Sequence, residues 1–410
     1  MERRVIITKL NKQILTSIME DGEIVEIHCS DDPVESKGSR HILGNVYIGR
    51  VRNIVANIGA AFIEIEPGIE CYYALDKNPQ PFFTRKIGKK PLCIGDEMLV
   101  QISKEAVKTK APTVTSAVSL TGRYVVLSMG NPKIGVSGKI GREKRAELIA
   151  LMEPCRNEEY GFVVRTNAKD APHEEIVCEA ERLIKVYRHL RETAGMRTCF
   201  SCLYQAPEAY LTDLKNLYQE GLKEYVVEDT ALHSQIAEYL GQEQPENLEK
   251  LRLYQDRQLP LHKLYSIDTV LGRALREKVW LKTGGYLIIQ PTEALTVIDV
   301  NSGKSISGRK AQDAYRKINL EAAAEAAKQM RLRNLSGIIL IDFINLEEKE
   351  AMNELLNTLR KYLIKDPVQA TLVDVTKLQL VEVTRKKVRK PLHESVKNNF
   401  TNMKESDIIS

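Results

Sequence analysis

Two apolar segments in the C-terminal third of the chain each end in an aspartate. The first is "LTVIDVNSG", residues 295–303, with Asp299, and the second is "GIILIDF", residues 337–343, with Asp342. Burying an unpaired carboxylate costs several kcal/mol, so neither aspartate can lie deep in a core without compensation. The sequence therefore requires a fold in which two core strands both end at a polar position.

A long helix is predicted between these two strands, over residues 311–334. Its apolar face, at helical spacing, consists of Ile318, Ala322, Ala326 and Met330. Small alanine side chains allow a helix to pack closely on a sheet. A strand–helix–strand unit makes the two strands parallel with a right-handed crossover. Both aspartates then lie toward the C-terminal ends of their strands, where open α/β sheets bind ligands.

The two aspartates favour a divalent metal ion. On neighbouring strands ~4.8 Å apart, two carboxylates repel by roughly 3 kcal/mol at an effective dielectric of ~20. Neither apolar run contains a lysine or arginine that could offset this repulsion. Oxygen ligands of this kind suit Mg²⁺, and Asn301 shares the strand face of Asp299. Either aspartate alone could instead cap the segment that follows it, but the pair around one helix favours a metal site.

The rest of the chain indicates several domains. A length of 410 residues predicts two to four of them. Short strands punctuated by glycine before residue 121 predict a small barrel or sandwich. Helical patterns dominate residues 210–275, and strands alternate with helices over residues 285–375, which is typical of an α/β layer. The predicted fold class is a multidomain α+β protein.

The overall composition argues for a cytoplasmic protein without a membrane span. The sequence contains no run of 18 apolar residues and no signal peptide at its start. Its seven scattered cysteines suit a reducing compartment. Cys199 and Cys202 have the spacing of a zinc knuckle, but no second pair follows, so a structural role is favoured.

Basic residues cluster although the net charge is only +5. The densest block is "RKKVRK", residues 385–390; a second block covers residues 139–145, and Arg331 and Arg333 lie near the second aspartate. Such clusters fit a polyanionic partner such as RNA, because contacts to phosphate supply most non-specific affinity for nucleic acids. Any single cluster could equally be a solvated surface.

Three long motifs carry a resemblance to a known family. "TEALTVIDVNSG", "INLEAAAEAAKQMRLRNLSGIILIDFINL" and "LQLVEVTRKKVRK" resemble the catalytic domain of the ribonuclease E/G family, and the similarity continues in order over nearly the whole chain. It implies a Mg²⁺-dependent endoribonuclease that cleaves single-stranded RNA during RNA processing and decay, leaving 5′-phosphate and 3′-hydroxyl ends. The metal would be held by Asp299 and Asp342, with Asn301 beside them. The alternative is an RNA-binding protein of the same fold that cleaves little or not at all.

The resemblance also divides the chain into domains. It implies an RNase H-like subdomain at 1–40 and 210–275, an OB-fold S1-type RNA-binding domain at 41–121, a 5′-sensor domain at 122–209, a DNase I-like α/β catalytic domain at 276–400 and a tail at 401–410. In this scheme Arg331, Arg333 and the block 385–390 would hold RNA backbone near the metal.

The implied RNA-binding domain has four assigned side chains. Phe62 and Tyr72 correspond to the family's exposed aromatics, and Lys104 and Lys110 correspond to its basic residues. OB folds bind single strands by aromatic stacking beside a basic groove. From the local sequence alone, Phe62 would be assigned to the barrel core.

The implied sensor favours substrates that carry a 5′-monophosphate. Its residues correspond to Arg165 and Thr166, a guanidinium and a hydroxyl that suit a terminal phosphate. Relatives carry paired arginines where this chain has Gly138 and Lys139, so weaker sensing is expected.

The C-terminal sequence departs from the family pattern. Relatives continue into a CPxC zinc link, whereas the last residues here, "KNNFTNMKESDIIS", contain no cysteine. We therefore expect no zinc link, and the oligomeric state stays open.

Overall fold

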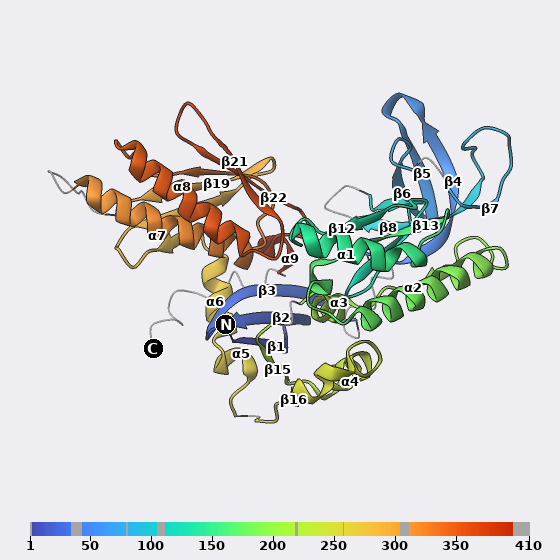
Figure 1. The fold of residues 1–410 in the computed structure, drawn as a ribbon, viewed down its shortest axis with the longest axis horizontal. Coiled ribbons are helices and arrows are strands. Elements are labelled where there is room, and N and C mark those ends of the chain that lie inside the picture. The colour runs from blue at the N-terminus through green and yellow to red at the C-terminus, as the bar shows by residue number, and fades with distance from the viewer. Residues whose placement is uncertain are drawn as a thin grey trace. The chain divides into compact units, whose positions relative to one another are not determined.

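The computed structural model describes residues 2–33, 43–78, 81–104, 111–217, 220–256, 258–303 and 311–396. The protein is a mixed α/β protein with two compact units (Figure 1). One unit combines Met1–Ser36 with Tyr218–Ser410, and the other is the intervening segment Lys37–Leu217. Within the described ranges, no helix has the length and apolar character needed to cross a lipid bilayer.

The discontinuous unit begins with a five-stranded sheet. The strand order is β16-β15-β1-β2-β3, with bounds β1 (Arg3–Leu10), β2 (Gln13–Glu20), β3 (Glu23–Asp31), β15 (Leu222–Val227) and β16 (Leu251–Leu253). The first three strands form antiparallel hairpins, and β1 then pairs in parallel with β15. The accompanying helices are α4 (Thr230–Glu243), η4 (Pro245–Lys250), α5 (Leu261–Leu264) and α6 (Ile267–Ala274).

The same unit contains a six-stranded sheet of order β17-β18-β19-β20-β22-β21. Its strands are β17 (Lys278–Trp280), β18 (Tyr286–Pro291), β19 (Leu295–Asn301), β20 (Gly337–Asp342), β21 (Ala370–Val375) and β22 (Val381–Arg385). Its helices are α7 (Ala311–Leu332), α8 (Lys349–Ile364) and α9 (Leu392–Ser395). The predicted strand–helix–strand unit is confirmed, because β19 and β20 are parallel neighbours joined through α7.

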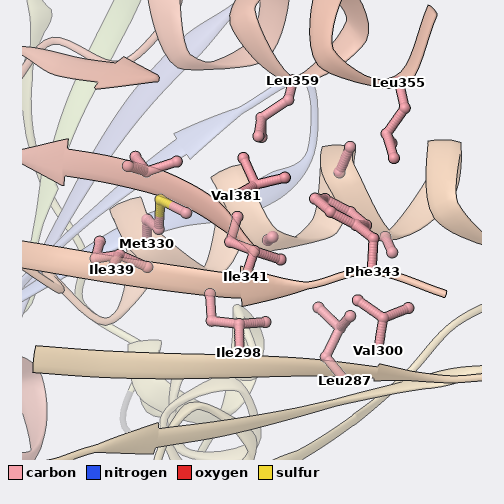
Figure 2. Close-up of a cluster of buried hydrophobic side chains, with 14 of the residues drawn as sticks. Leu287, Ile298, Val300, Met330, Ile339, Ile341, Phe343, Leu355, Leu359 and Val381 are labelled. Carbon is pink, nitrogen blue, oxygen red and sulfur yellow. The ribbon is translucent and has the colours of Figure 1, made fainter. Parts of the chain in front are cut away.

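Helices α7 and α8 cover one face of the six-stranded sheet. The predicted apolar face of α7 is confirmed, since Ile318, Ala322, Ala326 and Met330 are all buried. They pack with Ile298 and Val300 of β19, Ile339 and Ile341 of β20, and Leu355 and Leu359 of α8. Figure 2 shows Leu355 and Leu359 pointing from the helix toward the strands. Because alternate residues of these strands enter this core, the residues between them lie on the other face.

The inserted unit contains a closed five-stranded barrel, as the glycine-punctuated strands predicted. The closed order is β4-β5-β6-β9-β8-β4, consistent with an OB-like fold. The bounds are β4 (Val46–Val55), η1 (Ala56–Ile58), β5 (Ala60–Glu66), β6 (Ile69–Ala74), β7 (Phe83–Arg85), β8 (Glu97–Lys104), β9 (Thr113–Thr115) and β14 (Cys202–Tyr204).

A four-stranded sheet of order β10-β11-β13-β12 completes the inserted unit. Its elements are β10 (Ser119–Thr121), β11 (Val125–Met129), β12 (Ile134–Val136), α1 (Arg142–Met152), η2 (Glu153–Cys155), β13 (Tyr160–Val164), η3 (Thr166–Ala168), α2 (His173–Ala194) and α3 (Ala209–Asn216). Helices α1 and α2 share one apolar core with this sheet.

The last turn of α7 is tied to the five-stranded sheet by a buried ion-pair network. Arg331 donates through Nη1 and Nη2 to both carboxylate oxygens of Glu20, at 3.0 and 2.9 Å, and through Nε to Glu26 at 2.5 Å. The Arg331 side chain is only 14% exposed. The predicted contact between Arg331 and RNA backbone is therefore wrong, because its guanidinium is engaged inside the protein.

Two further arginines assigned to RNA backbone are also buried. Arg333 donates to Gln329 and to the carbonyl oxygen of Arg276. Arg385 forms a buried ion pair with Asp366 at 2.8 Å. The prediction is wrong for these two side chains as well, and local charge clustering misled it because partners distant in sequence were not visible. The exposed part of the block 385–390 stays a predicted RNA contact.

The network makes stability depend on pH. Burial by itself raises the pKa of Glu26, but the hydrogen bond from His28 and the charge of Arg331 outweigh it and lower this pKa to about 2. The folded-state pKa lies below the unfolded value, so the carboxylate contributes stability at pH values above about 4.5. That contribution is lost as the pH falls from there toward about 2.

We expect Arg331→Met to reduce the free energy of unfolding by about 3 kcal/mol at pH 7, because it removes the arginine partner of the buried Glu26 and leaves the half-buried Glu20 dependent on its ion pair with Arg3. Urea unfolding at pH 7 and pH 3 measures this loss, which should shrink at pH 3 as the carboxylates protonate. The matched control is Arg316→Met on the same helix, whose ion pair with Glu354 is exposed and should change stability by less than about 1 kcal/mol. Equal effects of the two substitutions would contradict the network's role.

Candidate active site

The two predicted aspartates lie directly opposite each other in the structure. Asp299 and Asp342 are register partners at the ends of β19 and β20. Their strand neighbours Ile298 and Ile341 are fully buried among the residues covered by α7 and α8. Both carboxylates therefore lie on the opposite face of the sheet, where Asp299 is half-buried and Asp342 is exposed.

Asn301 holds one of the carboxylates. Its Nδ2 donates to Oδ2 of Asp299 at 2.7 Å, across two residues of the same strand. Within the described ranges, no lysine or arginine forms an ion pair with either aspartate. The repulsion between two carboxylates on adjacent strands, roughly 3 kcal/mol at ~5 Å, is thus not offset by a cation of the described residues.

The donor set fits Mg²⁺ better than zinc. Among the described residues, no group of three or more histidine, cysteine, aspartate or glutamate side chains is arranged to hold a metal, so a closed zinc site is not formed there. Two carboxylates on an exposed sheet face instead match Mg²⁺, which takes one or two protein carboxylates and keeps several waters. Cys199 and Cys202 donate to backbone carbonyls of Ile48 and Tyr204, consistent with a structural role.

The predicted aromatic pair of the barrel lies together on its outer side. Phe62 and Tyr72 are register partners on β5 and β6, with ring centroids 6.3 Å apart in an edge-on arrangement. Both are half-buried and neither belongs to the barrel core, so the local assignment of Phe62 to that core is wrong. Lys104 is exposed at the end of β8, and Lys110 lies outside the described residues.

Arg165 and Thr166 follow β13 directly. Arg165 donates through Nη1 to the carbonyl oxygen of Gly122 and through Nη2 to Oδ1 of Asn216, both at 2.6 Å. The Thr166 hydroxyl shares a hydrogen bond of 2.8 Å with Ser137. These bonds give Arg165 a role in fixing the turn between β10 and β11, which the sequence did not indicate. Gly138 and Lys139 are exposed beside Ser137.

A buried glutamate completes that turn and was missed by the sequence analysis. The Glu179 carboxylate accepts hydrogen bonds from the backbone N–H groups of Arg123, Tyr124 and Val125 at 2.6, 2.7 and 2.9 Å. A Cβ on Gly122 would lie 2.4 Å from this carboxylate, so a larger residue there would displace Glu179 from its hydrogen bonds to the turn. Glu179 occupies an inward position of the amphipathic helix α2, and this polar residue on an apolar face was the available signal.

An aromatic pair beside the two aspartates was also not predicted. Tyr286 is the register partner of Asn301, and Trp280 is the register partner of Tyr286 on the next strand. The available signal was that Trp280 is the only tryptophan of the chain.

Comparisons with known proteins identify related sequences. Residues 119–388 match the model of the "Ribonuclease E/G family". The chain is 33% identical to ribonuclease G of Haemophilus influenzae over 389 residues, covering 92% of this chain and 78% of that protein. It is 31% identical to ribonuclease G of Escherichia coli, with 91% and 78% covered, and 32% identical to ribonuclease E of a Nostoc species, with 93% and 57% covered.

We expect Mg²⁺ to raise the thermal unfolding midpoint of the protein, because the ion would bind the folded state and remove the carboxylate repulsion. Asp342→Asn should abolish this increase, while in EDTA it should itself stabilise the protein by about 1 kcal/mol after allowance for solvent screening. The control Glu293→Gln changes an exposed carboxylate in the turn before β19 and should keep the full response to Mg²⁺. A midpoint of Asp342→Asn that still rises with Mg²⁺ would exclude this pair as the metal site.

Proposed function

The chain belongs to the ribonuclease E/G family and is an endoribonuclease, and we propose that it cleaves single-stranded RNA with Mg²⁺ bound by Asp299 and Asp342. The proposed products carry 5′-phosphate and 3′-hydroxyl ends, and the proposed role is RNA processing and decay. The observation that carries the proposal is the register of β19 and β20. It places the half-buried Asp299 opposite the exposed Asp342, and neither forms an ion pair with a lysine or arginine of the part of the chain that the structure describes.

In the proposed mechanism the chain supplies metal ligands and their orientation. Asp299 and Asp342 would hold the ion from two strands, and the sheet fixes the distance between these strands. A bound Mg²⁺ would supply Lewis acidity for activating water and for offsetting charge on the leaving oxygen. Asn301 donates its N–H to Asp299, which restricts rotation of that carboxylate and holds its other oxygen for the ion.

We further propose that the barrel binds the RNA strand. Phe62 and Tyr72 lie on β5 and β6, the second and third strands of the closed barrel. OB folds use the face formed by these two strands to bind oligonucleotides. The two aromatic rings would stack on bases, while Lys104 and Lys110 would contact phosphates.

Recognition of a 5′-monophosphate is proposed for Arg165 and Thr166. The Thr166 and Ser137 hydroxyls lie 2.8 Å apart, and the exposed Lys139 lies two residues after Ser137 in the chain. A terminal phosphate bound there would meet hydroxyl donors and an ammonium group. Since Arg165 also holds the turn at Gly122, its guanidinium would serve both the fold and the phosphate.

The finer domain description is likewise proposed. Its boundaries are an RNase H-like subdomain at 1–40 and 210–275, an S1-type domain at 41–121, a 5′-sensor domain at 122–209 and a DNase I-like domain at 276–400. The pairing of β1 with β15 supports the first of these, because it joins segments far apart in sequence into one sheet. A cytoplasmic location is proposed with it.

We expect Asp299→Asn and Asp342→Asn to reduce cleavage of an A/U-rich 5′-monophosphorylated RNA by at least about 100-fold in Mg²⁺, because each removes a metal ligand worth several kcal/mol in the transition state. Asn301→Ala should lose about 10- to 100-fold, since it acts only by orienting Asp299. Initial rates on a labelled oligonucleotide measure both. Glu293→Gln serves as the control, and equal rates for wild type and the aspartate variants would refute the site. RNA binding without cleavage by the wild type would favour a non-catalytic RNA-binding protein.

We expect Thr166→Val to narrow the difference in cleavage rate between 5′-monophosphorylated and 5′-hydroxyl RNA, because it removes a hydroxyl donor. The substitution keeps the hydrogen bonds that Arg165 makes to the fold. Arg165→Ala should narrow it further and also lower the unfolding midpoint. The control Arg156→Ala removes an exposed arginine of the same unit that pairs with Glu153. A wild-type enzyme that does not distinguish the two RNAs would leave these residues without a sensing role.

A further inference from the structure

An aromatic pair, the exposed Trp280 and the half-buried Tyr286, lies on the same sheet face as the two aspartates. Trp280 is 64% exposed, although it is the only tryptophan of the chain. Its ring centroid is 5.2 Å from that of Tyr286, with an angle of 63° between the rings. The neighbouring residues Leu287 and Ile289 are fully buried on the other face of β18, so this pair contributes little to the core.

A lysine extends over both rings. Lys278 Nζ lies 4.0 Å from the ring centroid of Trp280 and 3.9 Å from that of Tyr286. Such cation–π contacts hold the ammonium group close to the aromatic surface while it stays exposed. The three residues therefore combine two aromatic rings, inclined to each other, with a positive charge.

Strand register links this cluster to the aspartates. Tyr286 is the partner of Asn301, and Ile288 is the partner of Asp299. On the edge strand β17, Trp280 is the partner of Tyr286, and Lys278 is the partner of Ile288. Since the two strand spacings between β17 and β19 add to ~10 Å, the aromatic surface begins beside the carboxylates and extends away from them to the sheet edge.

This arrangement has the chemistry of a site for an unpaired nucleobase. Aromatic side chains next to basic groups bind single-stranded nucleic acids, because every base has a face that can stack and every nucleotide carries a phosphate. The positive charge of Lys278 complements phosphate, and the surface is continuous with the proposed metal site. A peptide partner would have no comparable need for an ammonium group beside the metal-binding carboxylates.

We propose that Trp280, Tyr286 and Lys278 form a subsite that stacks one unpaired base of the RNA substrate beside the phosphodiester that is cleaved, with Lys278 contacting the adjacent phosphate. The inference rests on the proposed nuclease function of Asp299 and Asp342. It also gives a reason for a preference for single strands, because bases inside a duplex cannot offer a face for stacking.

The single tryptophan allows a direct test without cleavage. All tryptophan emission comes from Trp280, so stacking of a base should quench it when a single-stranded RNA is added to wild-type protein in EDTA. Parallel titrations use Asp299→Asn in Mg²⁺, and binding of the same RNA is followed independently by anisotropy of a terminal label. Saturable RNA binding with unchanged emission from both proteins would overturn the subsite.

The position of the stacked base is tested with abasic substitutions. A series of RNAs, each lacking one base near the cleavage position, is titrated into the same proteins. An RNA that lacks the stacked base should bind without quenching the emission of Trp280. This loss of quenching should occur at only one or two positions, within about two nucleotides of the cleaved bond, as the ~10 Å separation requires. Loss of quenching only at distant positions, or at none, would contradict a subsite beside the scissile bond.

Substitutions separate stacking from a structural role. Trp280→Ala should weaken RNA binding between about 5-fold and about 100-fold, the range for loss of one stacked base, and Trp280→Phe should recover most of it. Tyr362→Ala is the matched control. Tyr362 belongs to α8, which covers the sheet face opposite to the aspartates. It is 37% exposed, and Lys365 lies over its ring. An equal loss in Trp280→Phe and Trp280→Ala, or in the control, would contradict stacking at Trp280.

The outcomes distinguish this inference from the proposed function. Quenching by RNA together with Mg²⁺-dependent cleavage supports both. Cleavage that depends on Asp299, without quenching, removes the subsite and leaves the nuclease site. Saturable quenching by RNA without any cleavage keeps the base-binding surface and removes the proposed catalytic role.

Discussion

The packing of α7 on the six-stranded sheet is the interaction on which the site depends. Ala322, Ala323 and Ala326 have no exposed surface, and their small side chains let the helix lie close to β19 and β20. The crossover through α7 makes these strands parallel neighbours, so both carboxyl ends reach the same sheet edge. The carboxylates face each other as a consequence. Larger side chains on α7 would separate the layers and cost about 1–3 kcal/mol through overpacking.

The sequence predicted this region well because its signals are local. The apolar strands, the helical spacing from Ile318 to Met330 and the two terminal aspartates all fall within about fifty residues, and a short crossover leaves few alternative topologies. The roles of the arginines were not predictable in the same way. The partners of Arg331 are Glu20 and Glu26, about three hundred residues earlier. A local charge cluster carries no information about such partners.

Short elements account for the rest of what the sequence did not reveal. Strand β17 has three residues, Lys278–Trp280, too few for an alternating pattern to indicate which side chains share a face. The position of Trp280 beside the aspartates follows only from two successive strand pairings. In the same way, the structural bonds of Arg165 reach Asn216 about fifty residues later, so its sequence motif indicated a ligand and not a turn. Both cases depend on contacts of the assembled fold: strand register for Trp280, and a helix and a turn distant in sequence for Arg165.

The insertion of one unit into the other fixes an order of events during synthesis. Strands β1 to β3 leave the ribosome before β15, and β1 lacks its parallel partner until β15 is made, about 190 residues after β3. The inserted unit, a continuous segment, is completed in that interval. At synthesis rates of about 5–20 residues per second, the edge of β1 stays unpaired for roughly ten to forty seconds. The nascent chain thus exposes an edge strand, a template for aggregation, until the later strand covers it.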